Sequence, residues 1–359
     1  MRVLILTGKF GMGHYSVAEA LKQEIEREEK EAYVEIVDLV EYMFPRSSKI
    51  IYKTFNFLVT KCSGIYNMLN NVASKHSDVP MKKNLAKRME GLINKHKPDI
   101  VLSTFPGCSQ YISAYIERSG APISLYTYIT DLTVHEEWIA ESTDLYFVGS
   151  ENTKNVLISM GISEDIIRVS GIPVRENFHH ENSVRGENSG RKKILIMGGG
   201  LGLLPKTDEV LRRLSSEKEL DITVITGNNR ELKNKLERDY PHMRIIGYTN
   251  EVDKYMKEAD LILTKSGGIT TFEAIYSETP MYIVTPFLSQ EVGNAQYIEQ
   301  KCIGKVAWDR KGDISADLMS LINNKQLLEK MRKNMGKAKM EFEPTSPVKA
   351  FRNVKRKVS

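Results

Sequence analysis

The chain has 359 residues, of which 41% are hydrophobic and 27% are charged, and it carries a net charge of +5. These values are typical of a soluble globular protein, and the length is sufficient for two domains that each bury a core. Three widely spaced cysteines without a CxxC pair argue against a disulfide framework or a structural zinc site and favour a reducing cytoplasm.

The first apolar run, Met1–Leu6, is followed by Thr7 and Gly8. This run is too short for a signal peptide and is typical of a first β-strand. No apolar run approaches the roughly 20 residues that a membrane-spanning helix needs. We therefore expect a cytoplasmic protein.

Short runs rich in Val, Ile and Leu alternate with helical patterns through both halves of the chain. The runs are Val3–Thr7, Val34–Asp38, Ile100–Ser103, Ile123–Ile129, Leu145–Val148 and Ile167–Val169, then Lys193–Met197, Ile222–Thr226, Met243–Ile246, Leu261–Thr264 and Met281–Val284. Runs of this kind are typical of parallel strands that are buried on both faces. The alternation predicts two doubly wound α/β domains.

A polar segment without periodicity divides the two halves and is expected to be a linker over residues 179–192. We predict an N-terminal domain over residues 1–178 and a C-terminal domain over residues 193–341. The basic segment 342–359 is interrupted by proline; we expect it to form a helix that packs back on the first domain, with a frayed tail as the alternative.

The first strand leads into a glycine-rich turn that ends in His14, where a helix over Tyr15–Glu28 begins. The positive end of a helix dipole lowers the pKa of a histidine there, and a neutral imidazole can act as a general base. Capping of the helix is the plainer interpretation of His14. The turn has neither the third glycine of a dinucleotide-binding fingerprint nor the Gly-Lys-Ser/Thr of a phosphate-binding loop.

The stretch from Tyr42 to Lys97 combines aromatic and aliphatic residues with many lysines and arginines. This combination suits the interface of an anionic membrane. An ordinary helix pair packed on the core explains it equally well, and no nucleic-acid-binding motif accompanies the basic residues. The residues that we assign to an acceptor or membrane side are Phe44, Tyr52, Phe55, Phe57, Lys82, Lys83 and, further along, Trp138.

Asp131 and His135 follow the strand Ile123–Ile129 and are candidates for an acid–imidazole pair. A zinc site is not expected because no third ligand stands at metal-binding spacing. Helix capping by Asp131 is the alternative.

The second domain also opens with a strand and a glycine-rich turn, Gly198–Gly202, in which the backbone can approach a ligand closely. Simple tight turning explains this motif equally well.

A more specific pattern follows the strand that ends at Thr264. Ser266-Gly267-Gly268 precedes a helical pattern that opens with Thr270, and Glu273 lies one turn further on. Small residues and free N–H groups at a helix N-terminus suit a phosphate, and the nearby carboxylate suits a ribose. The plainer interpretation is a helix start with Glu273 on a solvated face.

Gln290, Glu291 and Asn294 follow the next strand at its carboxyl end, where open α/β sheets bind ligands. Their polar side chains suit sugar hydroxyls, although turn formation and helix capping also favour such residues. The chain has no Asp-x-Asp pair of the kind that holds a metal-bound nucleotide. A diphosphate is therefore expected to be neutralised by helix dipoles and backbone N–H groups.

Several motifs together resemble the family of plant monogalactosyldiacylglycerol synthases and bacterial diacylglycerol glucosyltransferases, within glycosyltransferase family 28. They occur in family order along nearly the whole chain: Gly11–His14, Tyr128–Asp131 with His135 and Trp138, Ser170–Val174, Met197–Gly202, Ser266–Ala274 and Gln290–Asn294. A more distant similarity is to the lipid-linked N-acetylglucosaminyltransferase of peptidoglycan synthesis. Ser266-Gly267-Gly268 departs from the Gly-Pro-Gly or Ala-Gly often found in the family.

The resemblance implies a GT-B fold, in which two Rossmann-like domains face a cleft, and an inverting, metal-independent transfer from a UDP-sugar. It implies that His14 is the catalytic base. We assign Asp131, as the candidate acid of an acid–imidazole pair, to the catalytic group as well. It assigns UDP-sugar binding to Gly13, Gly199, Gly200, Ile246, Ser266, Gly267, Gly268, Thr270, Glu273, Gln290, Glu291 and Asn294. No cofactor is expected, because the UDP-sugar is a substrate.

The resulting hypothesis is a hexosyltransferase that uses UDP-glucose or UDP-galactose and acts on diacylglycerol at the inner face of the cell membrane. A non-lipid or polyprenyl-linked acceptor, a UDP-sugar epimerase and a non-catalytic nucleotide-binding module remain as alternatives. No nucleic-acid partner is expected.

Overall fold

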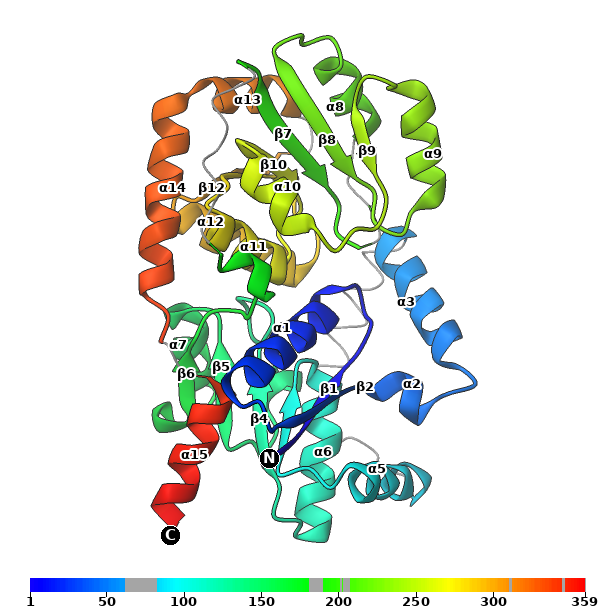
Figure 1. Cartoon of the computed structure of the whole chain (residues 1–359), viewed down its shortest axis with the longest axis vertical. Helices are drawn as coiled ribbons and strands as arrows, with labels where there is room; N and C mark the ends of the chain where they lie inside the picture. The colour runs from blue at the N-terminus through cyan, green and yellow to red at the C-terminus, as the bar shows by residue number, and fades with distance from the viewer. Residues whose placement is uncertain are drawn as a thin grey trace. The chain divides into compact units, whose positions relative to one another are not determined.

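The computed structural model describes residues 1–61, 83–180, 190–200, 202, 207–309, 312–343 and 346–358, and of these the side chains of 56–61, 83–84, 207 and 353–358 are not described. The chain divides into two compact units (Figure 1). The first comprises residues 1–176 and 342–359, and the second comprises residues 177–341.

The first unit is built on a six-stranded parallel sheet with the strand order β2-β1-β3-β4-β5-β6. The strands are β1 (Arg2–Thr7), β2 (Tyr33–Asp38), β3 (Ile100–Ser103), β4 (Ser124–Tyr128), β5 (Leu145–Val148) and β6 (Ile167–Val169). In register, Leu4 of β1 pairs with Glu35 of β2 and with Val101 of β3.

Helices cover both faces of this sheet. They are α1 (Gly13–Glu28), α2 (Leu39–Met43), α3 (Ser48–Lys61), α5 (Lys83–His96), α6 (Pro106–Ser119), α7 (Glu151–Ser159) and α15 (Pro347–Val358), with 3-10 turns η1 (Glu136–Trp138), η2 (Glu164–Ile166) and η3 (Glu176–Phe178). Leu4 and Leu6 pack with residues of α5 and α6. Successive side chains of a strand point to opposite faces, so the buried Val3 and Ile5 face the other layer. Burial on both faces explains why these strands lack polar alternation.

The second unit has a six-stranded parallel sheet with the order β12-β11-β10-β7-β8-β9. The strands are β7 (Lys192–Met197), β8 (Leu220–Ile225), β9 (Arg244–Ile246), β10 (Leu261–Thr264), β11 (Met281–Ile283) and β12 (Gly304–Val306). The helices are α8 (Thr207–Leu214), α9 (Arg230–Asp239), α10 (Val252–Glu258), α11 (Gly268–Ser277), α12 (Ser289–Gln300), α13 (Ile314–Asn323) and α14 (Lys325–Met340).

The two parallel sheets confirm the predicted α/β class with two doubly wound halves. The sequence patterns did not indicate β12, because only three residues form it and Gly304 and Lys305 interrupt the apolar run. Two helices begin before the predicted positions: α1 at Gly13 and α11 at Gly268. Both start at glycines, which have a low helix propensity and so conceal the first turn.

Each sheet has one point at which the strand order changes direction. In the first unit this switch point lies between β1 and β3, and in the second it lies between β7 and β10. The connections leave such a pair of strands toward opposite faces of the sheet, so a crevice opens between the carboxyl ends of the two strands. The topology therefore selects two places in the chain where a ligand can bind.

The C-terminal helix α15 belongs to the first unit and packs against α1. Val348 and Phe351 are buried, while Lys349 lies 3.8 Å from a carboxylate oxygen of Glu28 and Arg352 forms an ion pair with Glu29. Of the predicted linker over residues 179–192, residues 181–189 lie outside the described part of the chain.

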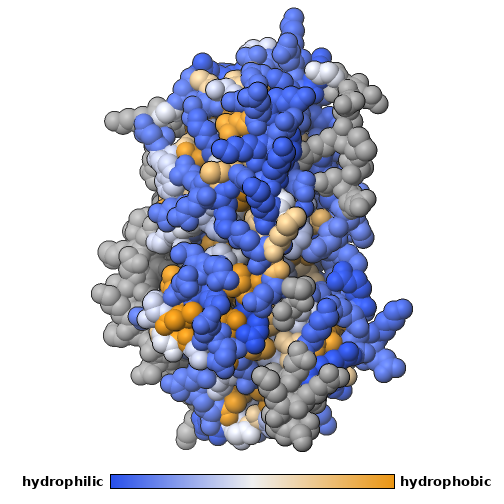
Figure 2. Space-filling model, turned by 90° about the vertical axis from the view of Figure 1, so that its left-hand side faces the viewer, coloured by the Kyte–Doolittle hydropathy of each residue, from blue (hydrophilic) through white to orange (hydrophobic). Residues whose placement is uncertain are grey.

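Among the described residues, no helix is both long and apolar enough to cross a lipid bilayer. The face of the molecule in Figure 2 is mostly hydrophilic, with small groups of apolar side chains.

Glu24 of α1 provides a test of the packing around this helix. Burial raises the pKa of Glu24 to about 7, from the usual 4.5, and the like charge of Glu28 adds to the rise. The folded state therefore binds a proton more tightly than the unfolded state, so the ionised group opposes folding increasingly as the pH rises from 4.5 through 7. We expect Glu24→Gln to raise Tm by about 2–4 °C at pH 8 and to change it little at pH 4.5.

Thermal unfolding of both proteins across this pH range measures the difference. The exposed Glu31→Gln is the matched control and should leave Tm unchanged at every pH. A Tm increase for Glu24→Gln that is equal at pH 4.5 and pH 8 would contradict the assigned pKa.

Candidate active site

The β1–α1 turn brings His14 to the switch point of the first sheet. β1 ends at Thr7, α1 begins at Gly13, and β3 on the other side of the switch ends at Ser103. Nδ1 of His14 lies 2.9 Å from the carbonyl oxygen of Thr104, the residue that follows β3. The predicted base therefore lies where the topology opens a crevice in this unit.

The hydrogen bond to Thr104 assigns the tautomer of His14. A carbonyl oxygen can only accept, so Nδ1 carries the hydrogen, and the lone pair of the neutral ring lies on Nε2. The hydroxyl oxygen of Thr130 lies 2.8 Å from the same Nδ1 and, since this nitrogen carries the hydrogen, acts as its second acceptor. Nε2 is thus the ring nitrogen that can take a proton from a substrate.

The burial of His14 favours the neutral form of its imidazole. Burial lowers the pKa of His14 below 6.5, while the negative charge of Asp131 and the hydrogen bond to Thr104 oppose this shift. The nearby His135 lowers the pKa further. The structure thus places Asp131, the second predicted catalytic residue, where its charge acts on His14 and stabilises the imidazolium form.

Aromatic side chains hold the glycine-rich loop that precedes His14. The ring of Phe10 in this loop lies 4.9 Å from Tyr52, 4.8 Å from Phe55 and 4.9 Å from Phe105. Phe105 in turn contacts the imidazole of His14 edge-on, with ring centres 5.2 Å apart.

Tyr52 also ties this loop to β2 by hydrogen bonds. Its hydroxyl donates to the carboxylate of Asp38 at 2.6 Å and accepts from the backbone N–H of Lys9 at 3.1 Å. The Nζ of Lys9 is 3.1 Å from a carboxylate oxygen of Glu41.

The residues that we assigned to an acceptor or membrane side lie in different surroundings. Phe44, Tyr52 and Phe55 are partly buried, and Phe44 packs against the core. Trp138 is completely buried, with its ring 6.3 Å from that of His14. Lys82 lies outside the described residues, and so do the side chains of Phe57 and Lys83.

In the second unit, two turns meet at the switch point between β7 and β10. In register, Thr264 at the end of β10 pairs with Met197 at the end of β7, so Lys265 and Gly198 leave the sheet side by side. Gly199 has φ +70°, and a Cβ there would stand 3.5 Å from Cε of Lys265. The structure therefore brings the predicted Gly199–Gly200 turn to the turn that contains Ser266.

The predicted phosphate-binding turn, Ser266–Gly268, is hydrogen-bonded to α12. The hydroxyl of Ser266 donates to the carbonyl of Glu291 at 2.7 Å, and the amide of Asn294 donates to the carbonyl of Ser266 at 2.9 Å. All three residues are buried. These contacts give Ser266 and Asn294 a positioning function, and their contact with a sugar nucleotide stays a prediction.

The remaining predicted residues of this half surround the same edge of the sheet. Gly267 is the N-cap of α11 without a side-chain cap, Gly268 begins the helix, and Thr270 and Glu273 are buried within it. Gln290 lies partly exposed in the first turn of α12. The helix start leaves backbone N–H groups that suit an anion.

Ile246 and Gly13 are the other two residues that we predicted to bind the UDP-sugar. The carbonyl of Ile246 accepts a hydrogen bond from the N–H of Thr226 at 2.8 Å and so ties the end of β9 to β8. Gly13 lies in the first unit, where it begins α1 directly before His14.

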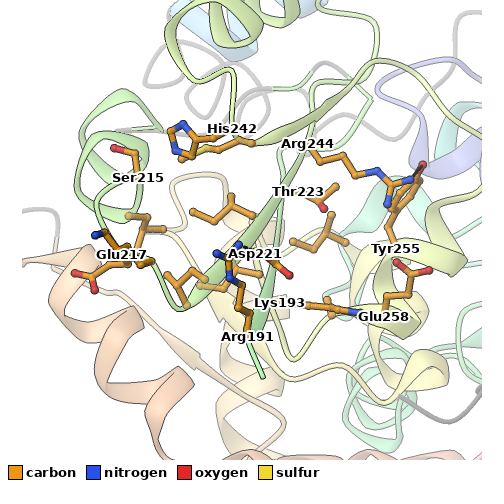
Figure 3. Close-up of a pocket in the computed structure, with 18 residues that line it drawn as sticks. Arg191, Lys193, Ser215, Glu217, Asp221, Thr223, His242, Arg244, Tyr255 and Glu258 are labelled. Atoms are coloured by element: carbon orange, nitrogen blue, oxygen red, sulfur yellow. Dashed lines mark hydrogen bonds and ion pairs between the residues drawn. The ribbon is translucent and has the colours of Figure 1, made fainter. Parts of the chain in front are cut away.

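A cavity of about 490 Å³ lies elsewhere in the second unit. Figure 3 shows Lys193, Asp221 and Arg244 among its lining residues, and these belong to the amino-terminal parts of β7, β8 and β9. Because all strands are parallel, this cavity is at the opposite edge of the sheet from the Gly199 and Ser266 turns. None of the predicted site residues lines it.

Sequence reasoning missed three residues that the structure places at the switch points: Thr104, Thr130 and Lys265. Thr104 and Lys265 directly follow apolar strands, and polar residues at carboxyl strand ends are a usable signal for a site. Thr130 lies two residues beyond β4, but only the folded chain shows that its hydroxyl reaches His14.

Comparison with known proteins shows the family of the chain. The family model of monogalactosyldiacylglycerol synthase matches residues 14–174, and that of the glycosyltransferase family 28 C-terminal domain matches residues 193–345. The processive diacylglycerol beta-glucosyltransferase of Bacillus licheniformis is 31% identical and that of Bacillus subtilis 28% identical; each alignment covers 93% of this chain and 90% of the relative.

Solved structures share the fold at lower identity. MurG of Acinetobacter baumannii has a TM-score of 0.60 at 17% identity and covers 99% of each chain. The spinosyn rhamnosyltransferase SpnG has a TM-score of 0.68 at 11% identity and covers 98% of this chain and 100% of its own.

The two Rossmann-like units, each with a glycine-rich turn at its switch point, have the GT-B fold. The family 28 match and the relatives show that the chain is a glycosyltransferase. The chain belongs to the family of monogalactosyldiacylglycerol synthases and diacylglycerol glucosyltransferases.

The tight packing of Gly202, in the turn after β7, can be tested by substitution. Gly202 has φ +63°, and a Cβ there would stand 2.1 Å from the carbonyl oxygen of Thr226. We expect Gly202→Ala to lower the free energy of unfolding by roughly 1–3 kcal/mol through backbone strain and this clash. Denaturant unfolding measures the change.

Gly336→Ala is the control of opposite sign, because Gly336 lies inside α14 with nothing within 4 Å of its added Cβ. It should stabilise the protein by about 0.5–1 kcal/mol. Equal effects of the two substitutions would contradict the tight packing of the Gly202 turn.

Proposed function

We propose that the protein transfers a hexosyl group from a UDP-sugar to 1,2-diacylglycerol, with inversion at the anomeric carbon and without a metal ion. The donor is UDP-glucose or UDP-galactose. The observation that carries this proposal is the imidazole of His14, whose neutral form is favoured by burial. Its Nδ1 is hydrogen-bonded to the carbonyl of Thr104, so Nε2 is the basic nitrogen.

In the proposed reaction the acceptor hydroxyl gives its proton to Nε2 of His14 while its oxygen attacks the anomeric carbon. The bond between that carbon and the diphosphate oxygen breaks, and UDP leaves with the electron pair. Attack from the side opposite the leaving group inverts the anomeric centre. The developing positive charge on His14 is stabilised by the carboxylate of Asp131.

The leaving diphosphate needs positive charge or N–H donors. The uncapped start of α11 at Gly268 and the turn at Gly199–Gly200 supply backbone N–H groups in this role. Among the described residues, no three His, Cys, Asp or Glu side chains are grouped so as to hold a metal ion. In the metal-free mechanism, the N–H groups of the α11 start and of the Gly199–Gly200 turn neutralise the diphosphate.

The substrates are inferred from the relatives. The relatives from Bacillus are named as diacylglycerol glucosyltransferases, which supports diacylglycerol as acceptor and glucose as the sugar. The matching synthase family model supports galactose as the other candidate. We expect an enzyme with a lipid acceptor to act at the inner face of the cell membrane, and the net charge of +5 favours an anionic surface there.

A transfer assay tests this function directly. The full-length protein is incubated with UDP-glucose or UDP-galactose and vesicles that contain diacylglycerol, and the lipids are analysed by mass. A hexosyl-diacylglycerol is the expected product. A change in the sugar nucleotide without any acceptor would instead indicate an epimerase and contradict the proposal.

Removal of the base tests the mechanism. We expect His14→Ala to lower kcat by roughly 10²-fold to 10⁴-fold, the usual contribution of a general base, while UDP affinity is retained. The exposed His242→Ala in the second unit is the matched control and should leave both values unchanged. Unchanged turnover in His14→Ala would contradict the role of His14.

The pH profile gives an independent test. Because the base must be neutral and its pKa is lowered, the acidic limb of kcat/KM should lie below pH 6.5. The charge of Asp131 raises the pKa of His14, so Asp131→Asn should move this limb to a still lower pH. A shift of the limb to higher pH would contradict the arrangement.

A further inference from the structure

Lys265 occupies the switch point of the second sheet without a role in the site described so far. It follows directly on the end of β10, next to the end of β7. Lysine is strongly hydrated, and a lysine that is partly withdrawn from solvent needs a partner or ligand that compensates its charge.

The side chain of Lys265 is directed across the switch point. Its Cε would lie 3.5 Å from a Cβ added to Gly199 in the turn after β7. Its side chain is 37% exposed, so the ammonium group keeps access to solvent. The cation therefore stands between the two turns and within reach of a ligand bound to them.

A buried carboxylate holds the ammonium group there. Oε1 of Glu291 lies 3.4 Å from Nζ of Lys265, and only 5% of the Glu291 side chain is exposed. The other carboxylate oxygen, Oε2, is 3.5 Å from the backbone N–H of Phe287. Since the ammonium group has three donors, one interaction with Glu291 leaves hydrogens for a second partner.

We propose that Lys265 binds the diphosphate of the sugar nucleotide and neutralises the charge that develops on the leaving UDP, and that Glu291 is the positioning residue that holds it there. This inference rests on the proposed function. It gives Glu291 a task different from contact with the donor sugar. Lys265 moves no proton in the reaction; it contributes a fixed positive charge.

The rival explanation is that Lys265 only compensates the buried charge of Glu291. The two explanations differ in how the contribution of Lys265 to ligand affinity depends on the phosphate groups of the ligand. A cation that binds phosphate strengthens binding of UDP and leaves uridine unaffected, whereas a structural lysine affects all ligands of the site equally.

The experiment measures the affinities of UDP, UMP and uridine by calorimetry for the wild type and Lys265→Met. We expect a loss of about 10- to 100-fold for UDP, the scale of a charged hydrogen bond, a smaller loss for UMP and no change for uridine. Lys265→Arg should retain most of the UDP affinity. Lys305→Met is the control, because this lysine forms a half-exposed ion pair with Asp317 in the same unit and should not alter binding.

The double variant Lys265→Met/Glu291→Gln distinguishes a loss of UDP binding from a loss of folding stability. Removal of both charges should restore the Tm that Lys265→Met alone lowers, while the UDP affinity stays low. Recovery of UDP affinity together with Tm would overturn the inference, and so would an equal loss for all three ligands or no loss for any. A wild-type protein without affinity for UDP would overturn the proposed function as well.

Discussion

The reversal of strand order at the first strand of each sheet is the constraint on which the candidate site depends. At β1/β3 and at β7/β10 the connections leave toward opposite faces, so the turns that follow these strands are not covered by their own helices. His14 with Thr104 lies at one reversal, and Gly199 with Lys265 lies at the other. Neither pair is close in sequence, and each is brought together by strand register.

The two switch points suit ligand groups of opposite charge: the first suits a proton and the second suits an anion. At the first, burial lowers the pKa of His14, and the carbonyl of Thr104 fixes the hydrogen on Nδ1, which leaves a neutral base. At the second, a buried carboxylate holds a lysine beside a glycine-rich turn. In the proposed mechanism a base and a cation correspond to the two needs of glycosyl transfer: removal of a proton from the acceptor and neutralisation of the leaving diphosphate.

The aromatic residues of the stretch from Tyr42 to Lys97 show that composition alone does not determine what a side chain contacts. Phe44, Tyr52 and Phe55 belong to a stretch whose composition suits a membrane interface, yet Tyr52 and Phe55 pack around Phe10 and so support the loop before His14. A membrane contact and a core contact require the same apolar side chains. Only the packing distinguishes them, and residues 62–82 of this stretch lie outside the described part of the chain.

The sequence by itself determined the α/β class and nearly all the strands, because strands buried on both faces must be continuous apolar runs between turns. It also indicated the turns at His14 and Ser266, since glycine and small residues leave a local pattern. The tertiary structure alone decided which residues support them. Thr104 and Thr130 hold one imidazole across 90 and 116 positions, and Asn294 holds Ser266 across 28. Such contacts depend on strand order and register, which no local pattern of residues records.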